Sequence, residues 1–243
     1  MSDFNTFEKL GESCEICVTK EHTFGTDAFL LADFAKARHK DIVCDLGTGC
    51  GIIAVLMRLR YEPKQVYGVD IQPQAIEQFE LTVSRSGLKE TYPLLMDLKA
   101  LTNDAPLCRC DLVTCNPPYK AAKAGIESEL SAHKIARHEI LCNISDVCAA
   151  GNKLLKYGGR LCLCNRPERL ADVMCAMRDN DIEPKYLRFV SKSPNDAPWL
   201  FLIEGRKGGG SFMQVLPQLY ISGSGGISPE LAQIYGKTDE RTE

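Results

Sequence analysis

The segment Asp41–Gly51, DIVCDLGTGCG, constrains the fold of this chain more than any other stretch of its 243 residues. It begins as an apolar run, ends on the acidic residue Asp45, and leads through alternating glycines into the apolar run Ile52–Leu59. This order is typical of a β-strand, a tight turn and the start of a helix. Glycines lack a Cβ and tolerate positive φ, so such a turn lets backbone approach a ligand closely. The glycines are Gly47, Gly49 and Gly51.

The spacing of these glycines indicates the kind of ligand. The dinucleotide fingerprint G-x-G-x-x-G would place its third glycine where this chain has Ile52. The pattern D-x-G-x-G-x-G, which begins at Asp45, instead resembles the first motif of the class I S-adenosylmethionine-dependent methyltransferases. The resemblance implies that the turn, including Thr48, lies against the amino-acid and ribose parts of S-adenosylmethionine. It also implies that Asp45 offers hydrogen-bond acceptors nearby.

Two later acidic residues end apolar runs and so mark the same edge of a parallel sheet. Asp70 ends the run at 65–71, about 20 positions after the glycine turn, where α/β nucleotide folds hold a ribose diol. Asp97 ends the run at 92–98 and is placed to accept a hydrogen bond from an adenine amino group. A helix cap or a surface turn is the alternative for either carboxylate. The expected cofactor contacts here are Asp70, Ile71, Asp97 and Leu98.

The tetrapeptide Asn116–Tyr119, NPPY, follows another apolar strand-like run. Pro117 and Pro118 fix two φ angles, remove two backbone donors and favour extended geometry before them. The Asn116 side-chain oxygen and the Pro117 carbonyl can then grip a planar amino group and direct its lone pair toward a sulfonium methyl. Tyr119 offers a face on which a base can stack. A purely structural turn is the alternative, but beside the glycine motif we interpret all four residues as catalytic, and Asn116 also as a cofactor contact.

The secondary structure of the first forty residues is predicted from their local sequence pattern. Residues 5–10 look like a short helix, followed by a glycine turn and a strand over 16–20. Thr26 or Asp27 can cap an amphipathic helix. Such a helix can simply pack against the core, but the resemblance to methyltransferases places Phe24, Thr26 and Asp27 over the cofactor.

The second half of the chain predicts a long helical pattern broken near Asn143, then a strand, a helix and two strands joined as a hairpin around Ser193–Pro198. The class I methyltransferases have such a hairpin at the end of their sheet. Positively charged residues also gather near NPPY. These residues either contact RNA or form a solvated surface. The candidate RNA contacts are Lys120, Lys123, Arg137 and Lys207.

The chain resembles one family over residues 24–235: the bacterial tRNA adenine-N6 methyltransferases that modify adenosine 37 of a valine tRNA. The matching segments are FGTDAFLLADFA, DLGTGCGIIA, NPPY, the triplet Arg137–Glu139, NRPERLADV and EGRKGGG. The resemblance implies a Rossmann-like, seven-stranded sheet that is mostly parallel and ends in an antiparallel hairpin. It also implies S-adenosylmethionine as cofactor, tRNA as partner and a flipped adenosine at Asn116.

The composition of the chain limits the fold classes and functions that are possible. A chain that is 44% hydrophobic fits one α/β domain, with residues 1–40 as a cap, 41–205 as a catalytic core and 206–243 as an extension. A net charge of −3 gives no global attraction for nucleic acid, so any RNA surface is local. We expect a cytoplasmic protein without membrane spans, signal peptide or disulfides. Cys14 and Cys17 lack a second pair, so no metal site is expected.

Three other functions stay open at this point. Protein glutamine-N5 methyltransferases share NPPY, but they carry a sizeable helical domain ahead of the glycine motif, where this chain has some forty residues. Ribosomal RNA guanine-N2 methyltransferases use the same type of tetrapeptide. A catalytically inactive RNA scaffold that binds the cofactor would tolerate damage to Asn116–Tyr119, which are intact.

Overall fold

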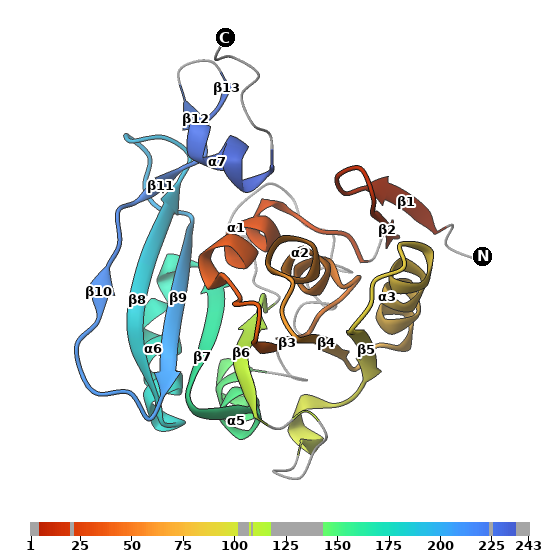
Figure 1. Ribbon diagram of the computed structural model, residues 1–243. Coiled ribbons are helices and arrows are strands. Elements are labelled where there is room, and N and C mark those ends of the chain that lie inside the picture. The colour runs from red at the N-terminus through yellow and green to blue at the C-terminus, as the bar shows by residue number, and fades with distance from the viewer. Residues whose placement is uncertain are drawn as a thin grey trace, which may run out of the picture.

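A computed structural model of the chain describes residues 5–19, 22–101, 107, 109–117, 143–223 and 226–236. A central sheet dominates it (Figure 1). Its strands are β3 (Ile42–Leu46), β4 (Gln65–Asp70), β5 (Thr91–Leu95), β6 (Cys110–Cys115), β7 (Leu155–Asn165), β8 (Ile182–Ser191), β9 (Leu200–Lys207), β10 (Gln214–Val215) and β11 (Leu219–Tyr220). They lie in the order β10-β8-β9-β7-β6-β3-β4-β5, with β11 also beside β8.

The strand directions agree with the predicted sheet. Neighbouring strands from β7 through β6, β3 and β4 to β5 are parallel, and β9 is antiparallel to both β7 and β8. The terminal antiparallel hairpin is therefore confirmed. Two short strands extend the sheet beyond the seven expected, because β10 and β11 both pair in parallel with β8. The division of the chain into a cap, a core and an extension stays a prediction.

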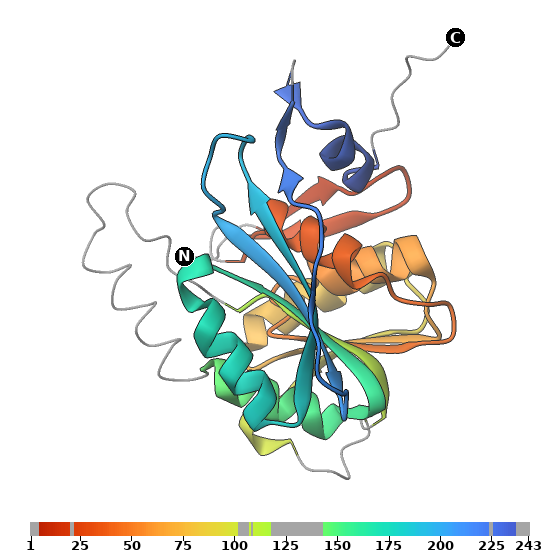
Figure 2. The ribbon, with the colours of Figure 1, turned by 90° about the vertical axis from the view of Figure 1, so that its left-hand side faces the viewer.

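Helices cover both faces of the sheet. They are α1 (Thr26–Ala35), α2 (Ile52–Tyr61), α3 (Pro73–Arg85), α5 (Ile144–Leu154), α6 (Leu170–Asp179) and the short α7 (Pro229–Ile234). The first three pack on one face, and α5 and α6 on the other, as the view from the β8 side shows (Figure 2). Two single-turn 3₁₀ segments, η1 (Leu98–Ala100) and η2 (Pro167–Arg169), follow β5 and β7. Two short hairpins lie outside the sheet, β1 (Thr6–Lys9) with β2 (Glu15–Val18), and β12 (Ser222–Gly223) with β13 (Gly226–Ile227).

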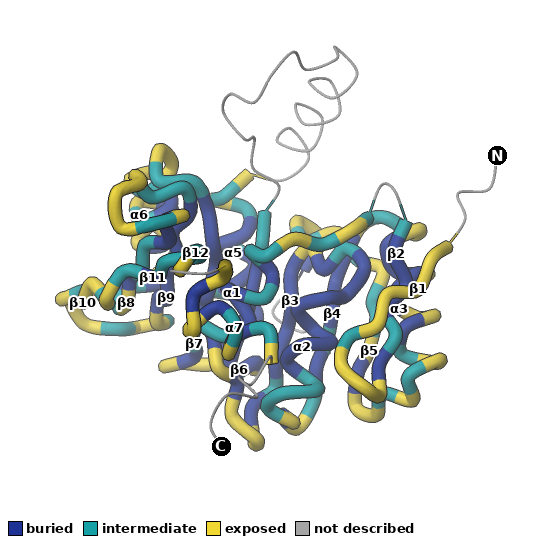
Figure 3. Tube along the Cα trace, turned by 90° about the horizontal axis from the view of Figure 1, so that it is seen from above, coloured by how far each residue is buried: buried dark blue, intermediate teal, exposed yellow. Residues whose placement is uncertain are grey.

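The core forms two hydrophobic layers because successive strand residues point to opposite faces. In β3, Val43 belongs to the layer under α1 and α2, whereas Cys44 belongs to the layer over α5 and α6. Leu112 and Val113 alternate in the same way in β6. Both faces are covered, which explains why these strands read as continuous apolar runs. Figure 3 shows β3 and β4 as buried and β1 and β10 as exposed.

Cysteine serves this core as a small apolar residue. The described cysteines are free thiols, and all of them except Cys175 are buried. Across the described ranges, no three His, Cys, Asp or Glu side chains gather in a way that would hold a metal ion. In the same ranges, no helix has the length and apolar character that crossing a membrane requires.

The predicted helix at residues 5–10 is wrong, since Thr6–Lys9 forms β1, antiparallel to β2. The reason lies in the tertiary structure. The hairpin is anchored on α3, where the Cys17 amide donates to the Thr82 hydroxyl at 2.9 Å and the Glu15 amide donates to Ser86 at 3.0 Å. These partners are 65 and 71 residues away in sequence, so a local pattern does not reveal them.

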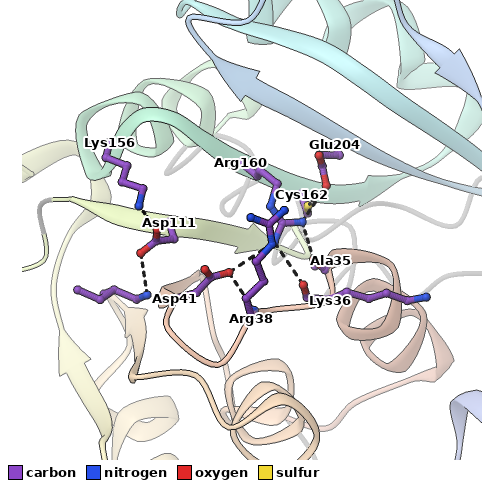
Figure 4. A network of polar contacts seen from close by, with 10 residues as sticks. Ala35, Lys36, Arg38, Asp41, Asp111, Lys156, Arg160, Cys162 and Glu204 are labelled. Atoms are coloured by element: carbon purple, nitrogen blue, oxygen red, sulfur yellow. Dashed lines mark hydrogen bonds and ion pairs between the residues drawn. The ribbon is translucent and has the colours of Figure 1, made fainter.

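A largely buried guanidinium, on a side chain that is 12% exposed, fixes α1 against the sheet (Figure 4). Arg160 of β7 donates to the carbonyl oxygens of Ala35 at 2.8 Å and Lys36 at 3.3 Å. It also pairs with Glu204 at 3.0 Å and lies 3.6 Å from Asp41. Removing one partner from such a buried pair is costly, because the other charge stays desolvated. The contacts hold the C-terminal end of α1, so they also fix where its N-terminal end lies, about 15 Å away.

Glycine allows α2 and α3 to meet at the turn after β3. Gly51, the residue before α2, has φ of 84°, and a Cβ on it would lie 2.2 Å from the Phe79 ring of α3. Gly47 also has positive φ, 66°, but among the residues that the structure describes no atom would lie within 4 Å of a Cβ there. The two glycines therefore have different roles: Gly51 permits packing, and Gly47 borders open space.

This difference predicts unequal stabilities. Gly51→Ala combines left-handed backbone strain with overpacking against Phe79, so we expect a loss of about 3 kcal/mol or more. Gly47→Ala carries the strain alone and should lose only about 1 kcal/mol. Urea denaturation of both variants measures the difference, and equal losses would contradict the packing role of Gly51.

Candidate functional site

The site lies where the chain changes direction across the sheet. From β3 the order runs to β4 and β5 on one side and to β6 and β7 on the other. In sheets of this type, ligands bind outside the carboxyl ends of the strands at such a switch point. We call the side where β3, β4, β5 and β6 end the carboxyl edge, and the opposite side the amino edge. The glycine turn follows β3, and Asn116 follows β6, so both lie at the carboxyl edge.

Asp45 connects these two turns. Its side chain is buried, and it accepts the Thr48 hydroxyl of the glycine turn and the Thr114 hydroxyl of β6, each at 2.7 Å. Burial raises the pKa of the Asp45 carboxyl to about 7, although the hydrogen bonds from Thr114 and Thr48 act to lower it. Both oxygens thus bind the protein itself. The structure gives Asp45 a bridging position between the glycine turn and β6, and its contact with the cofactor stays a prediction.

Asp70 holds the glycine turn from the neighbouring strand. One oxygen of its buried carboxylate accepts the Gly49 amide at 2.9 Å, and the other accepts the Gln72 amide at 2.9 Å. The oxygen bound to the Gln72 amide also accepts the Gln72 side-chain amide at 3.5 Å. A carboxylate has about four acceptor positions, so the oxygen bound to the Gly49 amide keeps one for a further donor. Ile71, the next residue, is 50% exposed at the same edge.

Asp97 and Leu98 lie at the end of β5. The Asp97 side chain accepts the Lys99 amide at 2.9 Å and caps η1, which agrees with the turn interpretation of this residue. Its carboxylate is exposed and has room for another donor. Leu98 is half-buried beside it. The carboxylates of Asp70 and Asp97 therefore share one edge, as the sequence predicted.

Asn116 is oriented by two neighbours. Its Nδ2 donates to Oδ2 of Asp27 at 3.1 Å, and its Oδ1 accepts the Cys164 thiol at 3.0 Å. A carboxylate only accepts hydrogen bonds, so Asp27 determines which way the amide faces. Sequence reasoning placed Asp27 over the cofactor and missed its bond to Asn116, 89 residues away. It also missed Cys164, which the alternation of β7 marks only as apolar.

The N-terminal end of α1 is covered by α7. The Thr26 hydroxyl lies 2.7 Å from the Tyr235 hydroxyl, and the Phe29 and Tyr235 rings meet edge to face at 4.9 Å. Phe24 packs against Phe29 with ring centroids 6.0 Å apart. Tyr235 is another residue that the sequence did not suggest. The segment holding Phe24, Thr26 and Asp27 thus reaches Asn116 through Asp27 while its other side chains pack against α7.

Several predicted site residues fall elsewhere. Lys207 ends β9 at the amino edge, and its ammonium donates to the carbonyls of Asn152 and Leu155. The structure does not bring it together with Asn116. The expectations for five residues lie outside the described ranges: Pro118, Tyr119, Lys120, Lys123 and Arg137. Pro117 is described and is half-buried.

The carboxyl edge has room for a ligand against the glycine backbone. Gly47 and Gly49 both have positive φ, and a Cβ on either would meet no atom of the described residues within 4 Å. Asp70 stabilises the turn through the Gly49 amide. Backbone that is held in place but borders open space can lie flat against a nucleoside or amino-acid group. The residues present therefore fit an S-adenosylmethionine-sized cofactor at this edge.

The chain is similar to known methyltransferases in sequence and in fold. The chain matches the model of the methyltransferase small domain family over residues 19–166. It is 26% identical over 204 residues, 83% of each chain, to a tRNA1(Val) (adenine(37)-N6)-methyltransferase of Aeromonas salmonicida (strain A449). The same-named protein of Histophilus somni (strain 129Pt) is 29% identical over 158 residues, 64% of each chain. A crystal structure of a predicted O-methyltransferase from Agrobacterium tumefaciens superposes with a TM-score of 0.68 at 19% identity, covering 87% of this chain and 96% of that one. The expected Rossmann-like class I methyltransferase fold is confirmed.

The buried Asp45 carboxyl predicts a pH-dependent stability. Its folded pKa of about 7 exceeds the ordinary value of 3.8, so folding binds a proton between these values. Stability should therefore fall as the pH rises through this window. Asp45→Asn cannot ionise and should lose this component, so its Tm relative to that of the unsubstituted protein should rise from about pH 5 to pH 8. Thermal denaturation without cofactor measures this, and parallel pH profiles would contradict it.

Proposed function

This chain belongs to the methyltransferase small domain family, and we propose that it transfers a methyl group from S-adenosylmethionine to the exocyclic N6 of an adenosine in tRNA. The relatives named above act on adenosine 37 of a valine tRNA by their names, and we propose the same nucleotide here. The observation that carries the proposal is the meeting of the glycine turn and Asn116 at the switch point, connected through Asp45.

We propose that the cofactor lies along the carboxyl edge from Asn116 to Asp97. Bound S-adenosylmethionine supplies an electrophilic methyl group on a sulfonium sulfur. Gly47 and Gly49 leave room for its amino-acid and ribose parts, and the remaining acceptor position on the Asp70 oxygen that binds Gly49 faces a ribose hydroxyl. Asp97 and the half-exposed Ile71 then flank the adenine ring.

Asn116 is the group that we propose to act on the methyl acceptor. The lone pair of the adenine amino group is delocalised into the ring, so this nitrogen is a poor nucleophile. Because Asp27 binds Nδ2, the Asn116 Oδ1 is the atom available to accept an N–H of that amine. The Cys164 thiol uses one lone pair of Oδ1, and a carbonyl oxygen has two.

The reaction needs no strong base in this arrangement. Positive charge develops on the amine nitrogen as the methyl group moves to it, and a preorganised acceptor stabilises that charge selectively. The methylated nitrogen is then acidic and loses its proton to water. Pro118 and Tyr119 complete the proposal as a rigid support and a stacking face for the base. Asp27 acts through Asn116 and is a positioning residue.

The proposed substrate is tested by nucleoside mass spectrometry. Unmodified tRNA and ribosomal RNA are incubated separately with the protein and isotopically labelled cofactor. We expect labelled N6-methyladenosine in the valine tRNA. Labelled N2-methylguanosine in ribosomal RNA without labelled N6-methyladenosine in tRNA would contradict the proposal and support one of the alternatives raised by the sequence.

The roles of Asn116 and Asp27 are tested by separating binding from turnover. Asn116→Ala should lower kcat by about 100- to 1000-fold, as loss of a transition-state hydrogen bond does, and should leave the Kd for the cofactor unchanged. Asp27→Asn presents an amide that can face Asn116 either way, so kcat should fall roughly tenfold. Calorimetry gives the Kd for the cofactor. A weaker Kd with an unchanged kcat in Asp27→Asn would instead assign Asp27 to the cofactor.

A further inference from the structure

A hollow lies at the amino edge of the sheet, opposite the proposed active site. Its volume is about 1060 Å³, and it opens between the links that lead into β3, β4 and β5. The ionisable residues that line it are His39, Lys40, Arg58, Glu62, Lys64 and Lys89. They come from three segments that are distant in the sequence and that the parallel sheet brings to one edge. The hollow shares no residue with the carboxyl edge.

The charge of this hollow is unbalanced. Lys40, Arg58, Lys64 and Lys89 are cationic at neutral pH, and Glu62 is the carboxylate among the lining residues. Three of these cations are exposed, namely Lys40, Lys64 and Lys89, and within the described residues their ammonium groups have no hydrogen-bond or ion-pair partner. The imbalance is notable because the whole chain has a net charge of −3.

Arg58 has a structural role that keeps the hollow in shape. Its guanidinium donates to the Pro63 carbonyl at 2.7 Å, the Glu90 carbonyl at 2.8 Å and the Thr91 hydroxyl at 3.3 Å. These bonds tie the end of α2 to the start of β5. The lysines are therefore carried on fixed backbone around the hollow, while their ammonium groups stay available to a ligand.

We propose that this hollow, which we call the amino-edge basic site, binds the phosphate backbone of the same RNA whose adenosine enters the carboxyl edge. The proposal rests on the proposed function. Clustered unpaired lysines favour a polyanion, because each bound phosphate releases condensed counterions. Strands of five or six residues separate the two edges by roughly 17–20 Å, at about 3.3 Å per residue. A folded RNA of tRNA size spans this distance, whereas a short anticodon stem–loop held at the carboxyl edge contacts fewer of these lysines.

The test uses Lys64→Glu, with Lys9→Glu as a matched control on the exposed β1 strand. Lys9 is also exposed, and its substitution changes the charge equally. Binding of unmodified full-length valine tRNA and of its isolated anticodon stem–loop is measured by fluorescence anisotropy at several salt concentrations. We expect Lys64→Glu to weaken tRNA binding about tenfold and Lys40→Glu/Lys64→Glu to reduce the salt slope of log K by about two. Stem–loop binding, cofactor binding and the Lys9→Glu control should change little.

Several results overturn the inference. These are unchanged tRNA binding in Lys40→Glu/Lys64→Glu, an equal loss for the stem–loop, or an equal loss in Lys9→Glu. Circular dichroism excludes misfolding, and the neutral pair Lys40→Ala/Lys64→Ala should show a smaller loss in the same direction. The proposed function fails separately: protein that binds tRNA through these lysines but forms no labelled N6-methyladenosine contradicts the reaction and leaves the amino-edge basic site in place.

Discussion

The hydrogen bonds of one buried carboxylate hold the proposed active site together. Asp45 accepts one hydrogen bond from a hydroxyl of the glycine turn and another from a hydroxyl of β6, so it joins the turn that we propose for the cofactor to the strand that leads to Asn116. Asp70 adds a second attachment through the Gly49 amide. A methyl transfer requires its two reactants in line and in contact, and a fixed separation between these turns supplies that alignment. Burial raises the pKa of the Asp45 carboxyl, which lowers the stability of the folded protein at neutral pH. The same buried position allows Asp45 to join the glycine turn to β6.

The orientation of Asn116 depends on contacts made far from it. Asp27 is on the first turn of α1, and α1 is held at its other end by Arg160 through the Ala35 and Lys36 carbonyls. The buried pair of Arg160 with Glu204 thereby helps to place a carboxylate at the opposite edge of the sheet. Charged pairs in a protein core often add little to the stability of the fold, but they can favour one arrangement of the packed elements over others. In this molecule the arrangement specified is the angle at which α1 approaches the carboxyl edge.

The sequence predicted the sheet, its antiparallel hairpin and the position of the glycine turn beside Asn116. These features could be predicted because they depend on short local patterns, namely DLGTGCG, the run ending at Asp70 and NPPY. It did not predict β1, whose partners on α3 are 65 and 71 residues away. It assigned Asp45 and Asp27 to the cofactor, which stays a prediction, and it did not reveal their hydrogen bonds with Thr48, Thr114 and Asn116. Residue type indicates that a carboxylate accepts hydrogen bonds, but only tertiary structure shows which donors reach it. The amino-edge basic site was missed for the same reason, since its lysines are scattered along the chain.

The contact between Thr26 and Tyr235 has a consequence for biosynthesis. The two hydroxyls are separated by 209 positions, and the Phe29 ring packs on the same tyrosine. A ribosome makes the chain from its amino end, so α1 emerges long before the segment that covers it. During synthesis, α1 therefore stays uncovered on this side until Tyr235 has left the ribosome, and the contacts that cover it form only after the strands of the central sheet have been made.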